Sequence, residues 1–333
     1  MPVASQTALI ATTPAPVPPA GVWCPAITFF DHENDQIDLI EQRRYYRYLS
    51  TTGLTGLVVL GTNPEAFLLT RAERSTLIVA AREAVGPRFP IMAGVGQHST
   101  RQVLENIADA ADAGADYALV LPPAYFGKAT TTAVLFDFFN EIAAKSPLPI
   151  VIYNFPAVCN GVDMDTDTII ALTERHNNIV GVKLTCGNVG KIVRLAATFR
   201  PWRFSTFGGQ SDFLIGGMAA GSVGCIAAMA NVCPAAVVRV YTRYKAGHVD
   251  EAMAVQRAIS LAEQVCRMSV AATKFAVSLT SAKAAGIKDA DDKVLPRRPY
   301  PPPPESVKAG IKKAVMGLQD ALKDVGNEPV VHL

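Results

Sequence analysis

The sequence predicts an α/β protein, a (β/α)8 TIM barrel with a C-terminal helical extension. Eight short apolar runs, typical of strands buried on both faces, alternate with amphipathic stretches of helical spacing. Strict alternation implies a parallel sheet, and eight units over roughly 210 residues match the size of a barrel. The alternative is an open doubly wound sheet, which usually has a glycine-rich turn after its first strand. Here the first run ends in Phe29, Phe30 and Asp31 instead, which favours the barrel.

Each expected strand is a run of mainly β-branched and aliphatic residues, and each expected helix has apolar residues on one face. The expected strands are 23–29, 56–60, 91–95, 117–121, 150–153, 179–184, 204–207 and 223–227. The expected helices between them are 36–52, 71–84, 100–113, 132–144, 166–175, 189–198 and 211–220. Local signals agree, because Thr70 and Glu73 form a capping box, and Gly53 and Gly114 stand where C-terminal caps belong.

Three regions follow from this pattern. Residues 1–20 are rich in Ala, Thr and Pro, so we expect a disordered tail. Residues 21–248 form the expected barrel, and residues 249–333 form the helical extension. Helical patterns at 250–268, 270–285 and 304–325 support it, and another at 235–245 precedes it. The proline-rich segment 296–304 is expected to be a stiff connector between two helices, with a polyproline ligand for a partner as the alternative.

Composition excludes several classes of function. Charged residues are 18% of the chain and the net charge is +2, so we expect neither a nucleic-acid nor a membrane partner, and a small substrate instead. The uncharged stretch 213–238 contains several glycines and a proline, which argues against a membrane span.

The six cysteines form no CxxC pair, and no cationic leader precedes them, so we expect reduced thiols in a cytoplasmic protein. The five histidines have no metal spacing, and we expect no metal and no cofactor.

Two reactive side chains stand near the ends of neighbouring apolar runs. Tyr153 closes the run 150–153, and Lys183 lies in the run 179–184. Apolar surroundings favour the neutral form of an amine, which can attack a carbonyl to form a Schiff base, and a nearby phenol can move the protons. The alternative is that Lys183 is a strand-end lysine reaching for solvent.

Further polar groups follow other expected strands, and barrel active sites lie at the C-terminal ends of the strands. Thr62 and Asn63 lie in a turn whose backbone amides can hold a carboxylate. Tyr125 follows the fourth strand and His98 the third. An ordinary loop hydroxyl and a rim aromatic are the alternatives for Thr62 and Tyr125, but their coincidence at one end of the barrel favours an active site.

Three motifs spread over about 300 residues resemble those of one family. Residues 61–67, Gly-Thr-Asn-Pro-Glu-Ala-Phe, resemble its Gly-Ser/Thr-Thr/Asn-Gly-Glu turn. Residues 153–156 resemble its Tyr-Asn-x-Pro, and residues 181–183 its Gly-x-Lys. The family comprises the pyruvate-dependent class I aldolases and lyases typified by dihydrodipicolinate synthase and N-acetylneuraminate lyase.

The resemblance implies a role for each matching residue. Lys183 is the Schiff-base lysine, Tyr153 the general acid/base, and Thr62 part of the proton relay. Tyr125 falls where a tyrosine of one subunit completes its neighbour's site, which implies a dimer or tetramer. The resemblance also implies substrate contacts, at Thr62, Asn63, Thr185, Gly209 and Ile226.

Departures from the family pattern narrow the expected activity. Pro64 replaces the family's glycine, which should reshape the turn without removing its amides. Val158 stands where dihydrodipicolinate synthases carry an arginine for the second substrate's carboxylate, which argues against that activity. Residues 209–212 and 224–228 offer fewer hydroxyl and acidic groups than neuraminate lyases have.

The sequence therefore predicts a class I aldolase that cleaves a 2-keto-3-deoxy sugar acid to pyruvate and a short hydroxyaldehyde such as glyceraldehyde. The alternatives are a 4-hydroxy-2-oxoglutarate aldolase, a condensing enzyme like dihydrodipicolinate synthase or a dehydratase using the same imine, and a barrel that binds 2-keto acids without turnover.

Overall fold

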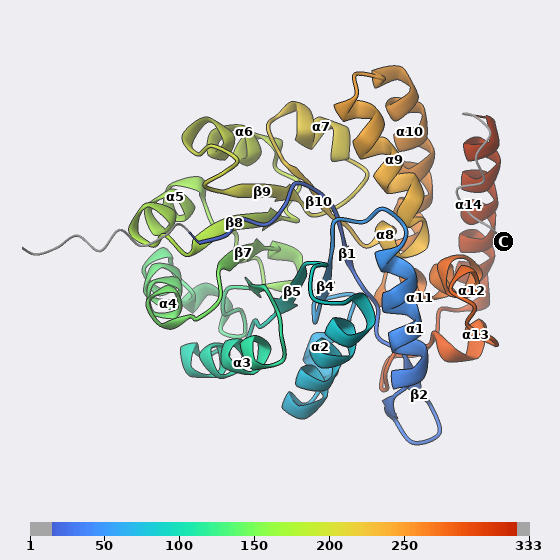
Figure 1. The fold of residues 1–333 in the computed structure, drawn as a ribbon, viewed down its shortest axis with the longest axis horizontal. Helices are drawn as coiled ribbons and strands as arrows, with labels where there is room; N and C mark the ends of the chain where they lie inside the picture. The colour runs from blue at the N-terminus through green and yellow to red at the C-terminus, as the bar shows by residue number, and fades with distance from the viewer. Residues whose placement is uncertain (1–14, 325–333) are drawn as a thin grey trace, which may run out of the picture.

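A computed structural model describes residues 15–324 and contains a closed barrel of eight parallel strands (Figure 1). Each barrel strand after the first pairs with the barrel strand before it in the sequence, and the last strand pairs with the first to close the barrel. The predicted barrel is therefore confirmed. Its strands are β1 (Gly21–Pro25), β4 (Gly56–Val59), β5 (Ile91–Gly94), β6 (Tyr117–Val120), β7 (Ile150–Asn154), β8 (Ile179–Leu184), β9 (Ser205–Gly208) and β10 (Gly224–Ile226).

Helices surround the barrel in the predicted alternation. They are α1 (Leu39–Ser50), α2 (Arg71–Val85), α3 (Thr100–Asp112), α4 (Thr132–Lys145), α5 (Thr166–Arg175), α6 (Val189–Thr198), α7 (Leu214–Ala219) and α9 (Pro234–Lys245). A short helix, α8 (Met229–Val232), precedes α9. The charge-free stretch 213–238 thus contains α7, β10, α8 and the start of α9. No helix among residues 15–324 is both long and apolar enough to cross a membrane.

The residues predicted to cap helix ends do so in the structure. Thr70 accepts a hydrogen bond from the Glu73 amide, and the Glu73 carboxylate accepts one from the Thr70 amide, completing the capping box. Gly53 and Gly114 have φ angles of 85° and 92°, in the left-handed region that glycine adopts without a Cβ clash.

The first crossover differs from the prediction, because helix α1 begins at Leu39 rather than at residue 36. A small hairpin of β2 (Phe30–Asp31) and β3 (Gln36–Ile37) precedes the helix. Its turn is formed by Asp31, whose carboxylate accepts hydrogen bonds from the Glu33 amide and the Asn34 side chain. Such short-range aspartate bonds stabilise a turn where amphipathic spacing alone indicates a helix.

The predicted N-terminal tail covers two kinds of residue. Residues 1–14 lie outside the described part of the chain. Residues 15–20 are ordered, because barrel side chains donate hydrogen bonds to their carbonyl groups. These bonds join Tyr117 Oη to Val17 O at 3.2 Å, Ser205 Oγ to Pro18 O at 2.8 Å and Trp23 Nε1 to Pro19 O at 3.1 Å.

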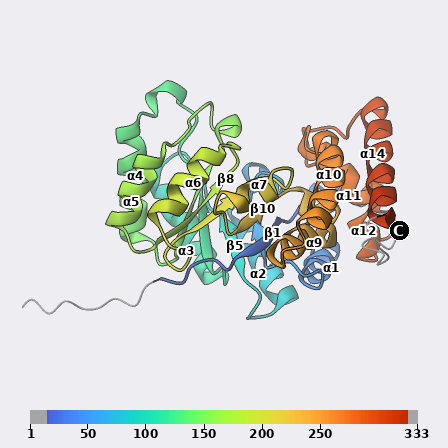
Figure 2. The ribbon, with the colours of Figure 1, turned by 90° about the horizontal axis from the view of Figure 1, so that it is seen from above.

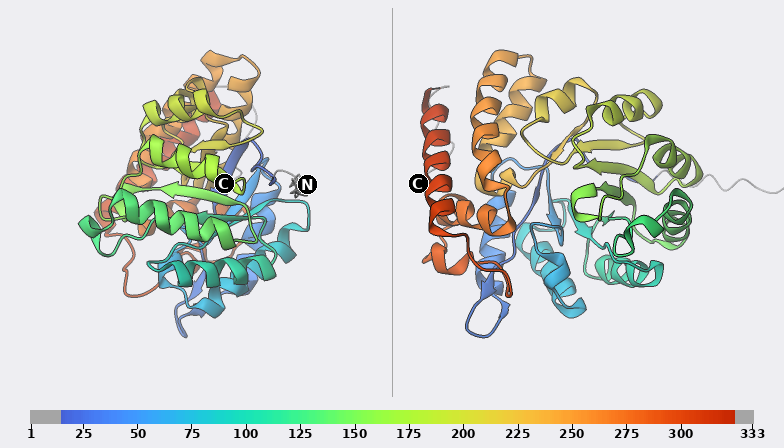
Figure 3. Two further views of the ribbon diagram at one scale, coloured as in Figure 1. Left: turned by 90° about the vertical axis from the view of Figure 1, so that its left-hand side faces the viewer. Right: turned by 180° about the vertical axis from the view of Figure 1, so that it is seen from behind.

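The C-terminal helices form a separate layer on one side of the barrel, beyond α1 and α9 (Figures 1 and 2). The layer consists of α10 (Val249–Cys266), α11 (Val270–Leu279), α12 (Ser281–Ala284), α13 (Ala290–Lys293) and α14 (Glu305–Asp324). Figure 3 shows α14, in red, as its outermost element. The helix predicted over 270–285 is interrupted at Thr280, whose φ and ψ of −126° and −99° are not helical. The proline-rich segment lies between α13 and α14, as predicted for a connector.

Candidate active site

Lys183 and Tyr153 lie directly opposite each other on the neighbouring strands β8 and β7. Both side chains are buried, at 4% and 3% exposure, and Lys183 Nζ is 4.1 Å from the centroid of the Tyr153 ring. Parallel pairing of two apolar strands is sufficient to produce this contact, because both residues stand at the same level of the sheet. The pairing gives a buried amine beside a phenol, and Lys183 does not reach into solvent as the alternative required.

Aromatic side chains pack next to Lys183 inside the barrel. The strand register places Phe207 opposite Lys183 on its other side. Trp23 packs edge-on against Phe207 and Tyr117, with ring centroids 6.2 and 6.1 Å apart. Trp23 and Phe207 are fully buried, so the interior of the barrel next to strand β8 is apolar.

The turn after β4 brings Thr62 to the same place. Thr62 Oγ1 lies 3.5 Å from Tyr153 Oη, at the outer limit of a hydrogen bond. The turn is closed by a bond from the Glu65 amide to Thr62 O at 3.1 Å. Within residues 15–324, the amides of Thr62 and Asn63 donate to no protein acceptor. Two unpaired donors in one turn are suited to a carboxylate ligand.

Backbone strain accompanies this turn. Leu60 and Glu65, one on each side of it, have φ angles of 67° and 59°, which non-glycine residues rarely adopt. Pro64 contributes its carbonyl, which accepts a 2.7 Å bond from the buried Thr28 hydroxyl. Strained residues of this kind persist only where the surrounding structure holds them in place.

Thr185 and Gly209 meet at the ends of β8 and β9. The Thr185 amide donates to Asn154 O at 3.0 Å, and the Gly209 amide donates to Leu184 O at 2.9 Å. A Cβ at position 209 would lie 2.0 Å from Thr185 Oγ1, so only glycine fits there. The buried Thr185 hydroxyl has no hydrogen-bond partner among the described residues, which leaves it available to a ligand.

Ile226 is fully buried at the C-terminal end of β10 and lies opposite Trp23 in the strand register. The structure thus brings Lys183, Tyr153 and Thr62 together.

Tyr125 is not part of this group. Its side chain is 75% exposed, and no hydrogen bond or ring contact within the described chain joins it to Tyr153 or Lys183. Tyr125 instead belongs to a row of aromatic rings that also contains Phe67, His98 and Phe126, with successive centroids 6.0, 6.1 and 5.3 Å apart. His98 is exposed, and its Nδ1 accepts a 3.3 Å bond from the Ala124 amide. The row marks the rim rather than the centre of the site.

A cavity of about 740 Å³ lies between the turn after β4 and the C-terminal helices. It shares Thr62 with the site, and most of its lining is apolar. The charged residue in the lining is Glu65, whose carboxylate pairs with Lys274. The lining residues are Thr62, Glu65, Ala66, Phe67, Leu68, Val158, Met268, Ser269, Val270, Ala271, Pro296, Tyr300, Pro301, Pro302, Pro303, Pro304 and Val307.

Several residues that orient the site could not be recognised in the sequence. Asn154 is fully buried and donates a 2.7 Å bond to Asp163, while its side-chain oxygen accepts one from the Met164 amide. Asp163 also pairs with the buried Lys191. The asparagine next to Tyr153 therefore fixes the loop after β7. Its place in the Tyr-Asn-x-Pro motif was the available signal.

Glu65 and Glu263 are two further buried carboxyl groups that hold loops of the site. Glu65 accepts a 2.8 Å bond from the Arg297 amide in addition to its pairing with Lys274. Glu263, on α10, accepts bonds from the Ser211 hydroxyl at 2.5 Å and the Ser211 amide at 3.3 Å. Burial raises the pKa of Glu263 to about 7. The helical pattern of the C-terminal region gives no sign of either contact.

No group of three or more His, Cys, Asp or Glu side chains among residues 15–324 is arranged to hold a metal ion. The six cysteines are free thiols, and burial raises the pKa of those at positions 24, 159, 225, 233 and 266. These five thiols are therefore packed side chains rather than nucleophiles.

Comparison with known proteins gives one family. The model of the dihydrodipicolinate synthetase family matches residues 18–317. A protein of Coccidioides immitis named "Putative 4-hydroxy-2-oxoglutarate aldolase, mitochondrial" is 62% identical over 299 residues, which cover 90% of this chain and 95% of that protein. The L-threo-3-deoxy-hexylosonate aldolase of Hypocrea jecorina is 38% identical over 78% of this chain and 86% of its own length.

A solved structure agrees with this assignment. Crystal structures of a dihydrodipicolinate synthase family protein from Coccidioides immitis match with a TM-score of 0.86 and 57% identity, over 94% of this chain and 99% of that one.

The expected cytoplasmic location is wrong, because the relative with 62% identity is named as mitochondrial. The cytoplasmic location was expected because the cysteines showed no disulfide pattern and no cationic leader was recognised. Reduced thiols distinguish reducing from oxidising compartments and do not separate the cytosol from other reducing compartments.

Proposed function

This chain belongs to the dihydrodipicolinate synthetase family, and we propose that it is a class I aldolase that cleaves a 2-keto-3-deoxy sugar acid to pyruvate and a short hydroxyaldehyde. The observation that carries the proposal is the buried Lys183 amine 4.1 Å above the Tyr153 ring. An amine that is desolvated and positioned beside a proton-transfer group is what imine chemistry requires.

The reaction follows from this geometry. Lys183 Nζ attacks the C2 ketone, and loss of water gives a protonated imine. As Tyr153 Oη takes the proton of the C4 hydroxyl, it passes its own proton on through Thr62 Oγ1. The C3–C4 bond breaks, and the aldehyde leaves while the electron pair moves into the imine as an enamine. The enamine takes up a proton at C3, and water then releases pyruvate and the free amine. Thr62 Oγ1, 3.5 Å from Tyr153 Oη, connects the phenol to further proton carriers.

Two groups on the protein are suited to the substrate carboxylate. The free amides of Thr62 and Asn63 provide donors in one turn. The unpaired Thr185 hydroxyl is buried two residues after Lys183. Preorganised donors in water-excluded surroundings bind an anion without the cost of rearranging solvent.

The cavity beside Thr62 supports a substrate with an uncharged distal end. No Lys or Arg side chain contributes to its described lining, and Val158 occupies part of it. A second carboxylate there would be buried without a cation, which costs several kcal/mol. The similarity to the L-threo-3-deoxy-hexylosonate aldolase of Hypocrea jecorina supports the same substrate class.

The second candidate substrate is 4-hydroxy-2-oxoglutarate. The observation that favours it is the name of the Coccidioides immitis relative, which has the higher identity of the two enzymes compared. The same C3–C4 cleavage applies, and the aldehyde product is then glyoxylate.

A homo-oligomer is part of the proposal. Tyr125, Phe126 and Phe67 are 75%, 74% and 53% exposed in the single chain, and exposed aromatic rows of this kind are typical of protein interfaces. A second copy packed on this rim would bring Tyr125 to a neighbouring site.

The test combines trapping with a comparison of rates. Pyruvate with borohydride should inactivate the protein and leave a reduced adduct on Lys183, identified by peptide mass. An adduct on Lys128 or Lys274 instead would contradict the site. Initial rates of pyruvate release from a 2-keto-3-deoxy-hexonate and from 4-hydroxy-2-oxoglutarate, measured under identical conditions, should favour the hexonate, and a clear preference for the dicarboxylate would select the second candidate.

A further inference from the structure

We propose that Lys274, on the C-terminal helix α11, is a positioning residue for the carboxylate-binding turn at Thr62 and Asn63. The inference rests on the proposed function, because it assigns that turn to the substrate carboxylate. It adds a role for the C-terminal helices, which otherwise lie outside the barrel and contribute no group to the chemistry.

The contact is a fully buried ion pair. Lys274 is 0% exposed, and its ammonium pairs with the Glu65 carboxylate, whose side chain is 4% exposed. Lys274 Nζ also donates a 2.9 Å bond to Leu295 O and lies 4.6 Å from the centre of the Phe30 ring. Burial lowers the pKa of Lys274, and Glu65 opposes that shift. Each charge is therefore compensated mainly by the other, so the two must stay together.

Glu65 is the residue that closes the turn. Its amide bonds to Thr62 O, and its φ of 59° is in the left-handed region. A glutamate leaves this conformation readily unless its side chain is fixed, because the Cβ contact with the backbone is unfavourable there. The ion pair fixes the side chain, and the amides of Thr62 and Asn63 are consequently held pointing away from the chain's own acceptors.

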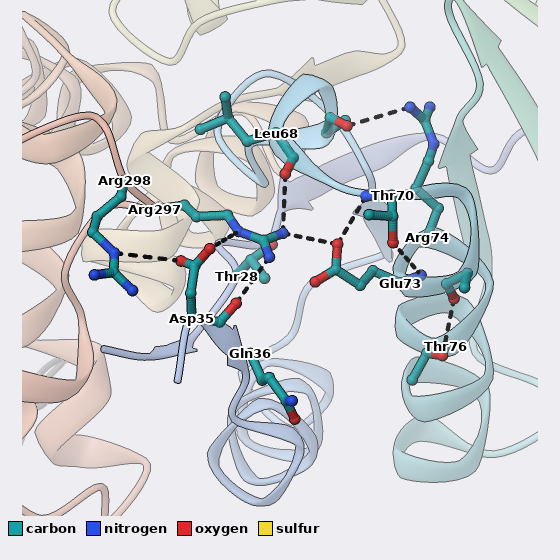
Figure 4. A network of polar contacts seen from close by, with 12 residues as sticks. Thr28, Asp35, Gln36, Leu68, Thr70, Glu73, Arg74, Thr76, Arg297 and Arg298 are labelled. Atoms are coloured by element: carbon teal, nitrogen blue, oxygen red, sulfur yellow. Dashed lines mark hydrogen bonds and ion pairs between the residues drawn. The ribbon is translucent and has the colours of Figure 1, made fainter. Parts of the chain in front are cut away.

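Arg297 provides a second attachment of the same turn, and Figure 4 shows its guanidinium between Leu68 and Glu73. Its amide donates to the Glu65 carboxylate at 2.8 Å. Its guanidinium donates to Leu68 O at 2.9 Å and to the Glu73 carboxylate at 2.8 Å. Lys274 and Arg297, both from the C-terminal region, thus hold the turn and the short 3-10 helix after it, Ala66–Leu68.

The test uses Lys274→Met, which keeps the length of the side chain and removes the charge. Lys293→Met is the matched control, because it makes the same change in the same layer and breaks the 2.8 Å ion pair with Asp38, at the start of α1 and away from the turn. The probe is pyruvate itself, and the readout is its half-saturating concentration for borohydride trapping on Lys183. A parallel measurement separates KM from kcat for the cleaved substrate.

Lys274→Met should raise the half-saturating pyruvate concentration about tenfold, the effect of one lost charge-assisted contact, and raise KM more than it lowers kcat. Lys293→Met should leave both unchanged. General instability would instead reduce kcat by lowering the folded fraction while KM stays constant, and that result would overturn the proposal. An unchanged pyruvate requirement in folded Lys274→Met would overturn it too.

Two outcomes remain to be separated. If Lys274→Met does not fold, Lys274→Gln carries the test, since it removes the charge and keeps an amide that can donate to Leu295 O. A rise in the pyruvate requirement supports the proposal, and an unchanged requirement overturns it. If the unmodified protein itself gives no adduct on Lys183, the proposed function fails rather than the role of Lys274.

Discussion

Two loops on either side of the Lys183–Tyr153 pair are attached to the C-terminal helices in different ways. The turn after β4 is held by a buried ion pair between Glu65 and Lys274. The loop after β9 is held by the buried carboxyl group of Glu263, which bonds to Ser211, and by Gln256, whose side chain donates to Asp212 O at 2.7 Å. A partly exposed ion pair between Asp212 and Arg267, at 2.9 Å, adds to this attachment.

The difference lies in how each buried carboxylate is compensated. Glu65 has a buried cation at contact distance, so its negative charge is balanced within the protein. Glu263 has hydroxyl and amide donors instead. Burial raises its pKa most, Asp212 nearby raises it further, and the bonds from Ser211 and the charge of Arg267 lower it. The first attachment should therefore be strong and specific, and the second should be weaker and should depend on pH.

The largest expected effect comes from removing one charge of the first attachment. Glu65→Gln leaves Lys274 buried without its counter-ion and should lower the free energy of unfolding by about 3–5 kcal/mol. Urea denaturation of the variant and of the unmodified protein at pH 7 measures the difference. A loss below about 1 kcal/mol, the level of an exposed pair, would show that the two attachments are equivalent.

A smaller effect, on the reaction rate alone, is expected from a change at Tyr153, which lies between the two loops. Tyr153→Phe removes the hydroxyl that we propose moves the C4 proton, and it should lower kcat about a hundredfold, equivalent to about 2.7 kcal/mol. It touches neither attachment, so imine trapping and urea stability should change little. Turnover that stays within a few-fold of the unmodified protein would exclude Tyr153 as the acid/base.

The smallest effect concerns pH. The pKa of Glu263 is raised from 4.5 to about 7 in the folded protein, so the folded state holds this proton more tightly than the unfolded state. Its contribution to stability is present below about pH 4.5, falls as pH rises to about 7, and then stays constant, a loss of about 2 kcal/mol between pH 5 and 8.

Glu263→Gln should remove that slope, because the amide cannot ionise and can still accept the Ser211 bond. Urea denaturation at pH 5, 6, 7 and 8 compares the two proteins, and parallel curves would contradict the assignment. Lys274→Met serves as the contrasting variant, since it should shift stability at every one of these pH values without flattening the slope due to Glu263.

The sequence was sufficient for the barrel because its pattern is local. Each strand and helix is encoded by the periodicity of its own residues, so strand β8 and helices α5 and α6 have the predicted bounds. Lys183 and Tyr153 could be placed together because neighbouring parallel strands have their C-terminal ends at the same edge of the sheet. The hairpin before α1 and the interruption at Thr280 were missed, since single turns set by side-chain bonds leave no periodic signal.

Only the tertiary structure decided how the site is held. Glu65 and Lys274 are far apart in the sequence, and nothing local distinguishes a lysine that pairs inside the protein from one that reaches water. Glu65 also has a left-handed conformation, and its partners, Lys274 on α11 and Arg297, lie beyond the barrel. The separation of Tyr125 from Lys183 could not be predicted from the sequence either. Whether Tyr125 lies at the rim or in the interior of the barrel depends on the path of the loop after β6. Periodicity encodes which face of an element is buried, whereas the pairing of buried charges depends on which distant elements meet.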